Sequence, residues 1–215
     1  MIALKTKPVR FVEKVMGGIY KRNGNVTALE EDSMSIDLDL SGVPLVIDAF
    51  ASVFTFNEDM KRHATDNGSV AAFAGVSYTD FLHWDLDSED SFLKSQRDGI
   101  ELIDRLMSMG ISTDSIRIFF SGRKGLHIFL INKDIRKYNG SEKLHTLVKS
   151  ICSDVAEGLE SFDTSVYDKT RIMRVTNSLH SKSNLYKIPI TYDELVHLSP
   201  SDIFKMAERQ REHEW

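Results

Sequence analysis

The middle of the chain alternates between hydrophobic patterns that are typical of strands and of helices. A period of two predicts a strand over 79–87, and apolar residues at helical spacing predict a helix over 91–109 that ends at Gly110. Two further strands are expected over 115–121 and 126–132, joined by a glycine-bearing turn. The predicted order is therefore strand, helix and hairpin.

The flanking segments carry weaker patterns. One predicted helix begins at about Ser141, a good N-cap, and carries an apolar stripe up to Leu159. The other expected features are a helix around 10–15, a strand within 43–51, a polar stretch over 57–69, strands over 171–175 and 186–190, and short helices over 192–197 and 201–211. No internal repeat or low-complexity tract interrupts the chain.

The strand predicted over 79–87 carries two carboxylates on one face. Side chains two apart on a strand share a face, so Asp85 and Asp87 project together. The apolar residues Leu82, Trp84 and Leu86 then face the opposite side. Two carboxylates at this spacing can share a pair of divalent ions, and hard oxygen ligands favour Mg²⁺ or Mn²⁺ over zinc.

An earlier Asp-x-Asp pair, Asp37 and Asp39, offers an alternative. Its alternating acidic and apolar residues are also explained by a half-exposed strand. Asp85 and Asp87 differ from this pair in context, because their strand leads into a strong helix and then into a cationic turn. We therefore place the candidate site at the later pair.

The turn over 121–127 suits a bound phosphate. Its two glycines permit positive φ and let backbone N–H groups approach an anion closely. The side chains that could donate to the same anion are Ser121, Arg123, Lys124 and His127. An ordinary cationic hairpin with His127 pointing to solvent remains the alternative.

A third group of polar residues follows the second predicted helix. Asp163 would complete a metal site, although it can also be explained as a residue of a helix-to-strand turn, and Asp168 competes for the same role. Arg174, His180 and Lys182 lie in a strand–turn–strand segment that could reach the same phosphates from the other side.

Length and charge narrow the class of protein. A chain of 215 residues with 41% hydrophobic residues can form one substantial domain or two small modules with a common core. The net charge of −5 argues against a protein that coats nucleic acid non-specifically. It allows a polymerase, whose template contacts need only a local basic patch.

Cysteine usage and hydropathy indicate the compartment. The single cysteine, Cys152, is expected on the apolar side of a helix, and it excludes an intrachain disulfide and a cysteine-based zinc site. The sequence has no apolar run of membrane-spanning length and no signal-peptide core at its N-terminus. We therefore expect a protein of the reducing cytoplasm.

Together these motifs resemble those of the archaeo-eukaryotic primase superfamily, the Prim-Pol polymerases. That family has an hhhDhD strand, a glycine-bearing turn with Ser and His, and a third hD carboxylate, which are matched here by 82–87, 121–127 and 162–163. The resemblance covers roughly 79–197. It implies metal binding by Asp85, Asp87 and Asp163, and triphosphate binding by Ser121, Arg123, Lys124, His127, Arg174 and His180.

The resemblance also implies a fold and an activity. The implied fold is α+β: a catalytic core over 1–215, with a smaller N-terminal α/β module over 1–75 and an RRM-like antiparallel sheet with packed helices over 76–215. The implied activity is that of a DNA-dependent primase or polymerase, which adds NTPs or dNTPs on a single-stranded DNA template during replication. Two Mg²⁺ or Mn²⁺ ions are expected, with no zinc. A phage, plasmid, archaeal or bacterial origin would fit, with a helicase or accessory initiation domain as partner.

Three alternatives stay open. The polymerase domain of bacterial end-joining ligases shares the Lys-Gly-Leu-His turn and an ending like 190–195, so a gap-filling repair polymerase is one alternative. A non-catalytic nucleotide- or nucleic-acid-binding module is another, because RRM-like sheets often bind without chemistry. A phosphodiesterase that uses the same carboxylates is the third.

Overall fold

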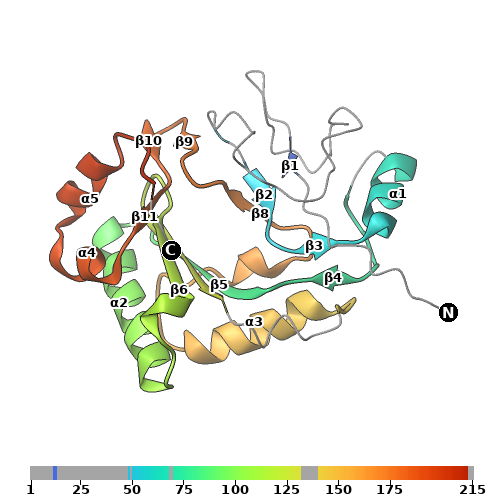
Figure 1. The fold of residues 1–215 in the computed structure, drawn as a ribbon, viewed down its shortest axis with the longest axis horizontal. Coiled ribbons are helices and arrows are strands. Elements are labelled where there is room, and N and C mark those ends of the chain that lie inside the picture. Colours follow the sequence, from blue (N-terminus) through green and yellow to red (C-terminus); the bar gives the residue numbers. More distant parts are fainter. Residues whose placement is uncertain (1–11, 14–47, 49, 68–69, 132–139, 213–215) are drawn as a thin grey trace.

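A four-stranded antiparallel sheet forms the centre of the protein (Figure 1). The computed structural model describes residues 12–13, 48, 50–67, 70–131 and 140–212. The strands, in spatial order, are β11 (Ile188–Ile190), β6 (Ile116–Phe120), β7 (Gly125–Ile131) and β5 (Phe81–Asp87). The hydrophobic pattern predicts all four of these strands, within two residues at each end.

Two helices cover the apolar face of this sheet. Helix α2 (Phe92–Ser108) contacts β5 and β7, and α3 (Leu144–Val155) contacts β5. Trp84 and Leu86 are completely buried, as the alternation on β5 predicts, and the indole of Trp84 donates a hydrogen bond of 3.0 Å to the carbonyl oxygen of Cys152. Cys152 itself is buried and free. The opposite face of the sheet carries Asp85 and Asp87, and we call it the polar face.

A second sheet lies over that polar face. It consists of β1 (Val12–Glu13), β2 (Phe50–Ser52) and β8 (Ile172–Arg174), with antiparallel neighbours. The helix predicted around 10–15 is therefore wrong at its centre. Pairing with β2, which is distant in sequence, outweighs the local pattern there. Asp37 and Asp39 lie outside the described residues.

A short segment that follows α3 in the chain pairs with the outer edge of β5. Leu86 and Phe162 form an antiparallel bridge. On its two sides the N–H of Asp163 donates to the carbonyl oxygen of Asp85 at 2.9 Å, and the N–H of Asp87 donates to that of Ser161 at 2.8 Å. This order is compatible with the RRM-like sheet, which stays a prediction.

The remaining elements are short. They are β3 (Thr55–Phe56), α1 (Glu58–Asn67), β4 (Ser77–Tyr78), the 3₁₀ turns over Thr113–Ser115 and Thr164–Tyr167, β9 (Leu179–His180), β10 (Leu185–Tyr186), α4 (Tyr192–His197) and α5 (Pro200–Met206). Helix α1 lies within 57–69, where the sequence pattern predicts a polar stretch and no helix. Its buried apolar residues are Met60 and Ala64, too few for a recognisable stripe.

The N-terminal and C-terminal parts of the chain meet in one sheet. Strand β8 comes from the C-terminal part, yet it pairs with β2 along Phe50–Arg174, Ala51–Met173 and Ser52–Ile172. A module boundary at residue 75 stays a prediction. Within the described ranges, no helix is both long and apolar enough to cross a bilayer.

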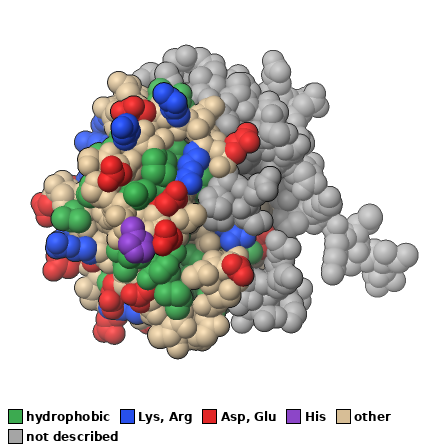
Figure 2. Space-filling model, turned by 60° about the vertical axis from the view of Figure 1, so that its left-hand side comes forward, with side chains coloured by type: hydrophobic (Ala, Val, Ile, Leu, Met, Phe, Trp, Pro, Cys, Tyr) green, Lys and Arg blue, Asp and Glu red, His purple; other side chains and the backbone are tan. Residues whose placement is uncertain are grey.

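The face of the protein shown in Figure 2 carries side chains of both charges. Figure 2 shows acidic and basic side chains interspersed over the described part of the face that it presents. This mixture agrees with the net charge of −5. It does not resemble the broad basic surface of a protein that coats nucleic acid non-specifically.

Candidate active site

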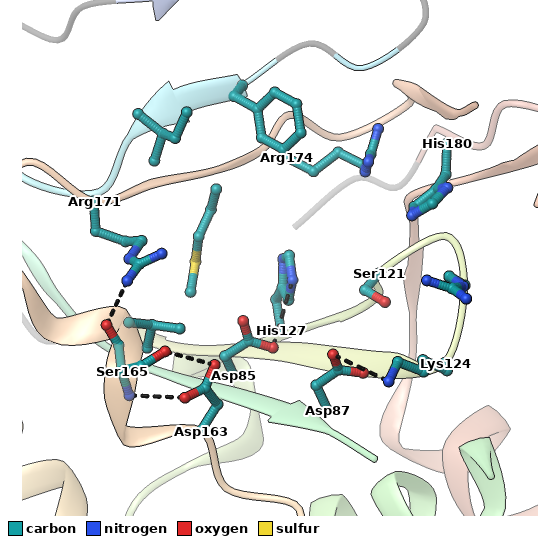
Figure 3. A pocket seen from close by; sticks show the side chains of 15 residues that line it. Asp85, Asp87, Ser121, Lys124, His127, Asp163, Ser165, Arg171, Arg174 and His180 are labelled. Carbon is teal, nitrogen blue, oxygen red and sulfur yellow. Dashed lines mark hydrogen bonds and ion pairs between the residues drawn. The ribbon is translucent and has the colours of Figure 1, made fainter. Parts of the chain in front are cut away.

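A pocket of about 290 Å³ opens between the polar face of the central sheet and the second sheet. All nine site residues that the resemblance implies line it: Asp85, Asp87, Ser121, Arg123, Lys124, His127, Asp163, Arg174 and His180 (Figure 3). They come from five separate segments of the chain. The structure thus brings the predicted residues together, while their roles stay predictions.

Strand register places a histidine beside the first carboxylate. Asp85 lies directly opposite His127 in the β5–β7 ladder, and Nε2 of His127 is 3.7 Å from Oδ1 of Asp85. The His127 residue is only 7% exposed, so the interpretation in which it points to solvent is wrong. Burial lowers its pKa well below the usual value, which keeps the imidazole neutral. Within the described part of the chain, its Nδ1 has no hydrogen-bond partner.

The bridge at the edge of β5 brings Asp163 beside Asp85. The carboxylate of Asp163 caps the 3₁₀ turn, because it accepts hydrogen bonds from the N–H of Ser165 at 2.7 Å and from its Oγ at 3.0 Å. Asp168 instead accepts from Thr170 and forms a 2.9 Å ion pair with Arg171, and it does not line the pocket. Of the two competing carboxylates, only Asp163 is therefore at the site.

The three carboxylates repel one another. Burial raises the pKa of Asp85 to about 7, and the negative charges of Asp87 and Asp163 add to that rise. Burial also raises the pKa of Asp87; Lys124, whose Nζ lies 3.7 Å from Oδ2, opposes the rise and Asp163 adds to it. Burial and the neighbouring carboxylates therefore favour the protonated form of Asp85 when no cation is bound.

This donor set has the chemistry that Mg²⁺ and Mn²⁺ prefer, since it consists of carboxylate oxygens. Burial and the charges of Asp87 and Asp163 raise the pKa of Asp85, and a bound divalent cation would oppose this rise. Among the residues that the structure describes, no three His, Cys, Asp or Glu side chains already meet as a metal-binding cluster. The donors thus fit such an ion by type, and its binding stays a prediction.

The glycine-bearing turn is shaped by close backbone contacts. Gly122 has a φ of +95°, and a Cβ there would come within 3.2 Å of the Cβ of His180 and of the carbonyl oxygen of Leu185. A Cβ at Gly125 would lie 2.6 Å from the carbonyl oxygen of Leu86. Ser121 closes the turn, because its Oγ accepts from the N–H of Gly125 at 3.1 Å. The turn is therefore packed against both β5 and the β9–β10 hairpin.

Arg174 faces the carboxylates from the opposite wall. Its guanidinium lies over the ring of Phe50, its direct partner in the β2–β8 ladder, 4.9 Å from the centroid. Asp48 forms an ion pair of 2.6 Å with Nη1 of Arg174. The Arg174 side chain is therefore held in place before any ligand binds.

His180 enters from the β9–β10 hairpin. Its Nδ1 accepts a hydrogen bond of 3.1 Å from the N–H of Lys182, so Nε2 carries the proton of the neutral ring. Burial lowers the pKa of His180, and the charge of Arg174 lowers it further. His180 is thus a neutral donor at the pocket. Lys182 is exposed and does not line the pocket.

Several pocket residues escaped sequence reasoning. They are Phe50, Ser165, Val166, Arg171, Ile172 and Met173. Arg171 had a signal, as a second cation in the strand predicted to contain Arg174. Phe50 had none, because it reaches the site only through its pairing with β8.

The comparisons with known proteins found similar structures but no similar sequences. No protein-family model matches the chain, and no curated protein sequence does. The fold is similar to the polymerase domain of Mycobacterium tuberculosis ligase D, solved in complex with DNA, with a TM-score of 0.44 and 15% identity over 74% of this chain and 58% of that one. It is also similar to the AEP domain of the cyanophage S-2L primase-polymerase, with a TM-score of 0.40 and 12% identity over 71% of this chain and 70% of that one.

Both structures belong to the archaeo-eukaryotic primase superfamily, which the sequence motifs resemble. The chain spans 58% of the length of the ligase D domain. Both likenesses are weak in sequence and in TM-score, so we infer the function from the residues of the site itself.

Proposed function

We propose that this chain is a nucleotidyltransferase of the primase-polymerase kind, which joins NTPs or dNTPs along a single-stranded DNA template and primes DNA replication. The observation that carries this proposal is the division of charge within one pocket. Carboxylates occupy the β5 side, and cationic or neutral donors occupy the turn and the opposite wall.

A nucleoside triphosphate needs both kinds of group. Its phosphates would be bound by the forked donors of Arg123 and Arg174 and by the point charge of Lys124. His180 would add a neutral N–H donor. These polar side chains would lie on two sides of the phosphates and would hold the α-phosphate over the carboxylates.

The carboxylates would act at the reacting atoms. When bound at Asp85, Asp87 and Asp163, divalent ions would polarise the α-phosphate and favour ionisation of the attacking 3′-hydroxyl. Asp163 can contribute while it still caps its turn, because each carboxylate oxygen has a second lone pair. The bond from the 3′-oxygen to the α-phosphorus would form as the bond to pyrophosphate breaks.

The proposal is tested by strand synthesis. The whole chain is incubated with Mn²⁺ or Mg²⁺, a single-stranded template and labelled NTPs or dNTPs, with and without a primer. Asp85→Asn should abolish product, while Asp66→Asn, which changes an exposed residue of α1, should leave it unchanged. Circular dichroism of both variants controls for folding.

Each outcome assigns a different function. New strands without a primer support a primase, and extension only with a primer indicates a gap-filling polymerase of the end-joining type. Triphosphate binding without any Asp85-dependent product would indicate a non-catalytic module. Release of mononucleotides without added NTP would indicate a phosphodiesterase. Extension only with a primer would overturn the priming role, and the last two results would overturn the whole proposal.

A further inference from the structure

Lys187 lies beneath the pocket rather than in its lining. The residue is 3% exposed and precedes β11. Its main chain pairs with the segment before β9: the N–H of Lys187 donates to the carbonyl oxygen of Ser178 at 3.1 Å, and its own carbonyl oxygen accepts from the N–H of Asn177 at 2.7 Å. These bonds fix the backbone, so that the side chain has a defined direction.

The ammonium of Lys187 reaches the main chain of the opposite wall. Its Nζ donates a hydrogen bond of 2.7 Å to the carbonyl oxygen of Arg174. The same atom lies 4.9 Å from the ring centroid of Phe119 and 5.4 Å from that of Phe129. Phe119 lies directly opposite His127 in the β6–β7 ladder, so these rings belong to the polar face of the sheet. The ammonium therefore links this face to β8.

Burying an ammonium to form one hydrogen bond with a carbonyl group costs free energy, because the charge loses its hydration. Burial lowers the pKa of Lys187 to about 7, which the negative charge of Asp85 opposes and the charge of Arg174 reinforces. For Asp85, Lys187 is in turn the cation that most opposes the raised pKa. Both the charge and the position of this side chain are thus coupled to the site.

We propose that Lys187 is a positioning residue: from beneath the pocket, its ammonium fixes β8 at Arg174 and so aims the Arg174 guanidinium at the phosphates of the nucleotide. The inference rests on the proposed function, because it takes the phosphates as the ligand of Arg174. Lys187 itself touches no substrate. It acts through Arg174, whose guanidinium is held at its other end by Asp48.

The test is the affinity for a nucleoside triphosphate in the whole chain. Lys187→Met keeps the length of the stem but removes the donor. We expect its Kd for a non-hydrolysable dNTP, measured by calorimetry, to rise about tenfold, as loss of a charged hydrogen bond predicts. The KM in primer extension should rise similarly, with a smaller change in kcat. A purely structural defect would lower the active fraction, and so kcat, at constant Kd.

Two matched variants sharpen the result. Lys205→Met changes an exposed lysine of α5 and should leave Kd unchanged. Lys187→Arg keeps a buried cation that can bond the carbonyl oxygen, and its Kd should stay within about threefold of the wild-type value. If Lys187→Met fails to fold, Lys187→Leu, which also lacks a donor, replaces it with the same expected rise in Kd.

A double-mutant cycle separates action through Arg174 from a direct effect. In an Arg174→Gln background, Lys187→Met should change Kd by less than about twofold. An unchanged Kd in Lys187→Met alone, or a full effect in the Arg174→Gln background, would overturn the inference. Failure of the wild-type chain to bind the triphosphate would overturn both this inference and the proposed function.

Discussion

The main-chain N–H of Asp163 donates to the carbonyl oxygen of Asp85 at 2.9 Å, so two carboxylates that are far apart in sequence lie side by side at one edge of the central sheet. The Leu86–Phe162 bridge completes this pairing. The position of Asp163 is thus set by backbone bonds. The side chain of Asp163 can therefore be changed while these backbone bonds are kept. The effect of a substitution on activity can then be measured separately from its effect on folding.

Asp163→Asn should abolish activity while leaving the fold intact. The asparagine keeps an oxygen acceptor for the N–H of Ser165, so the free energy of unfolding should change by less than about 1 kcal/mol. Loss of the negative charge should lower strand synthesis by more than about a hundredfold. Urea denaturation and primer extension measure the two effects.

Asp168→Asn is the matched control for that experiment. Asp168 is half-exposed and its ion pair with Arg171 is of a kind that contributes little. Synthesis should stay within about twofold of the wild-type rate. Equal losses in the two variants would mean that the third carboxylate is wrongly assigned.

The pH dependence of stability should report the buried Asp85 carboxyl in metal-free protein. Its folded pKa is about 7 against an ordinary value of 3.8, so between these values the folded state binds a proton that the unfolded state lacks. Stability therefore falls as the pH rises through this range. Relative to Asp85→Asn, the wild-type free energy of unfolding should decline from about pH 4 to 7 and then level off. Parallel curves from urea denaturation in EDTA would contradict the assignment.

Mn²⁺ should stabilise the wild-type chain against heat. An ion that binds only the folded state at a hundred times its Kd contributes about 2.7 kcal/mol. The rise in Tm should be larger at pH 8 than at pH 6, because the ligand carboxylates must lose their protons. Asp87→Asn should lose most of this rise, and Asp66→Asn should keep all of it. A rise retained in Asp87→Asn would place the ion elsewhere.

Gly122→Ala should damage both stability and substrate binding. The alanine would be strained at a φ of +95° and would crowd His180 and Leu185. We expect a loss of about 2–3 kcal/mol in the free energy of unfolding, and a raised KM for the nucleotide because the β9–β10 hairpin must move.

Gly110→Ala separates backbone strain from crowding. Gly110 has a φ of +85°, but a Cβ there would have nothing within 4 Å. This variant should lose about 1 kcal/mol and keep the wild-type KM. If both alanine variants behave alike in urea denaturation and kinetics, the packing of Gly122 against the hairpin does not contribute to nucleotide binding.

Local pattern was enough to predict much of the core. Alternation identified β5 and the face of Asp85 and Asp87, and helical spacing identified α2. Both signals are strong because each element has one buried and one exposed side. Helix α1 escaped because it buries little of itself, and β1 was mistaken because its partner is distant in sequence.

The sequence by itself determined which side chains could form the site, since carboxylates, glycines and cations are recognisable by type and spacing along single elements. Only the tertiary structure placed Asp163 rather than Asp168 in the pocket, turned His127 inward, and brought Phe50 and Lys187 to Arg174. These relationships depend on pairings between distant strands. Such pairings are selected by the burial and hydrogen bonding of the whole sheet, which no local window of sequence contains.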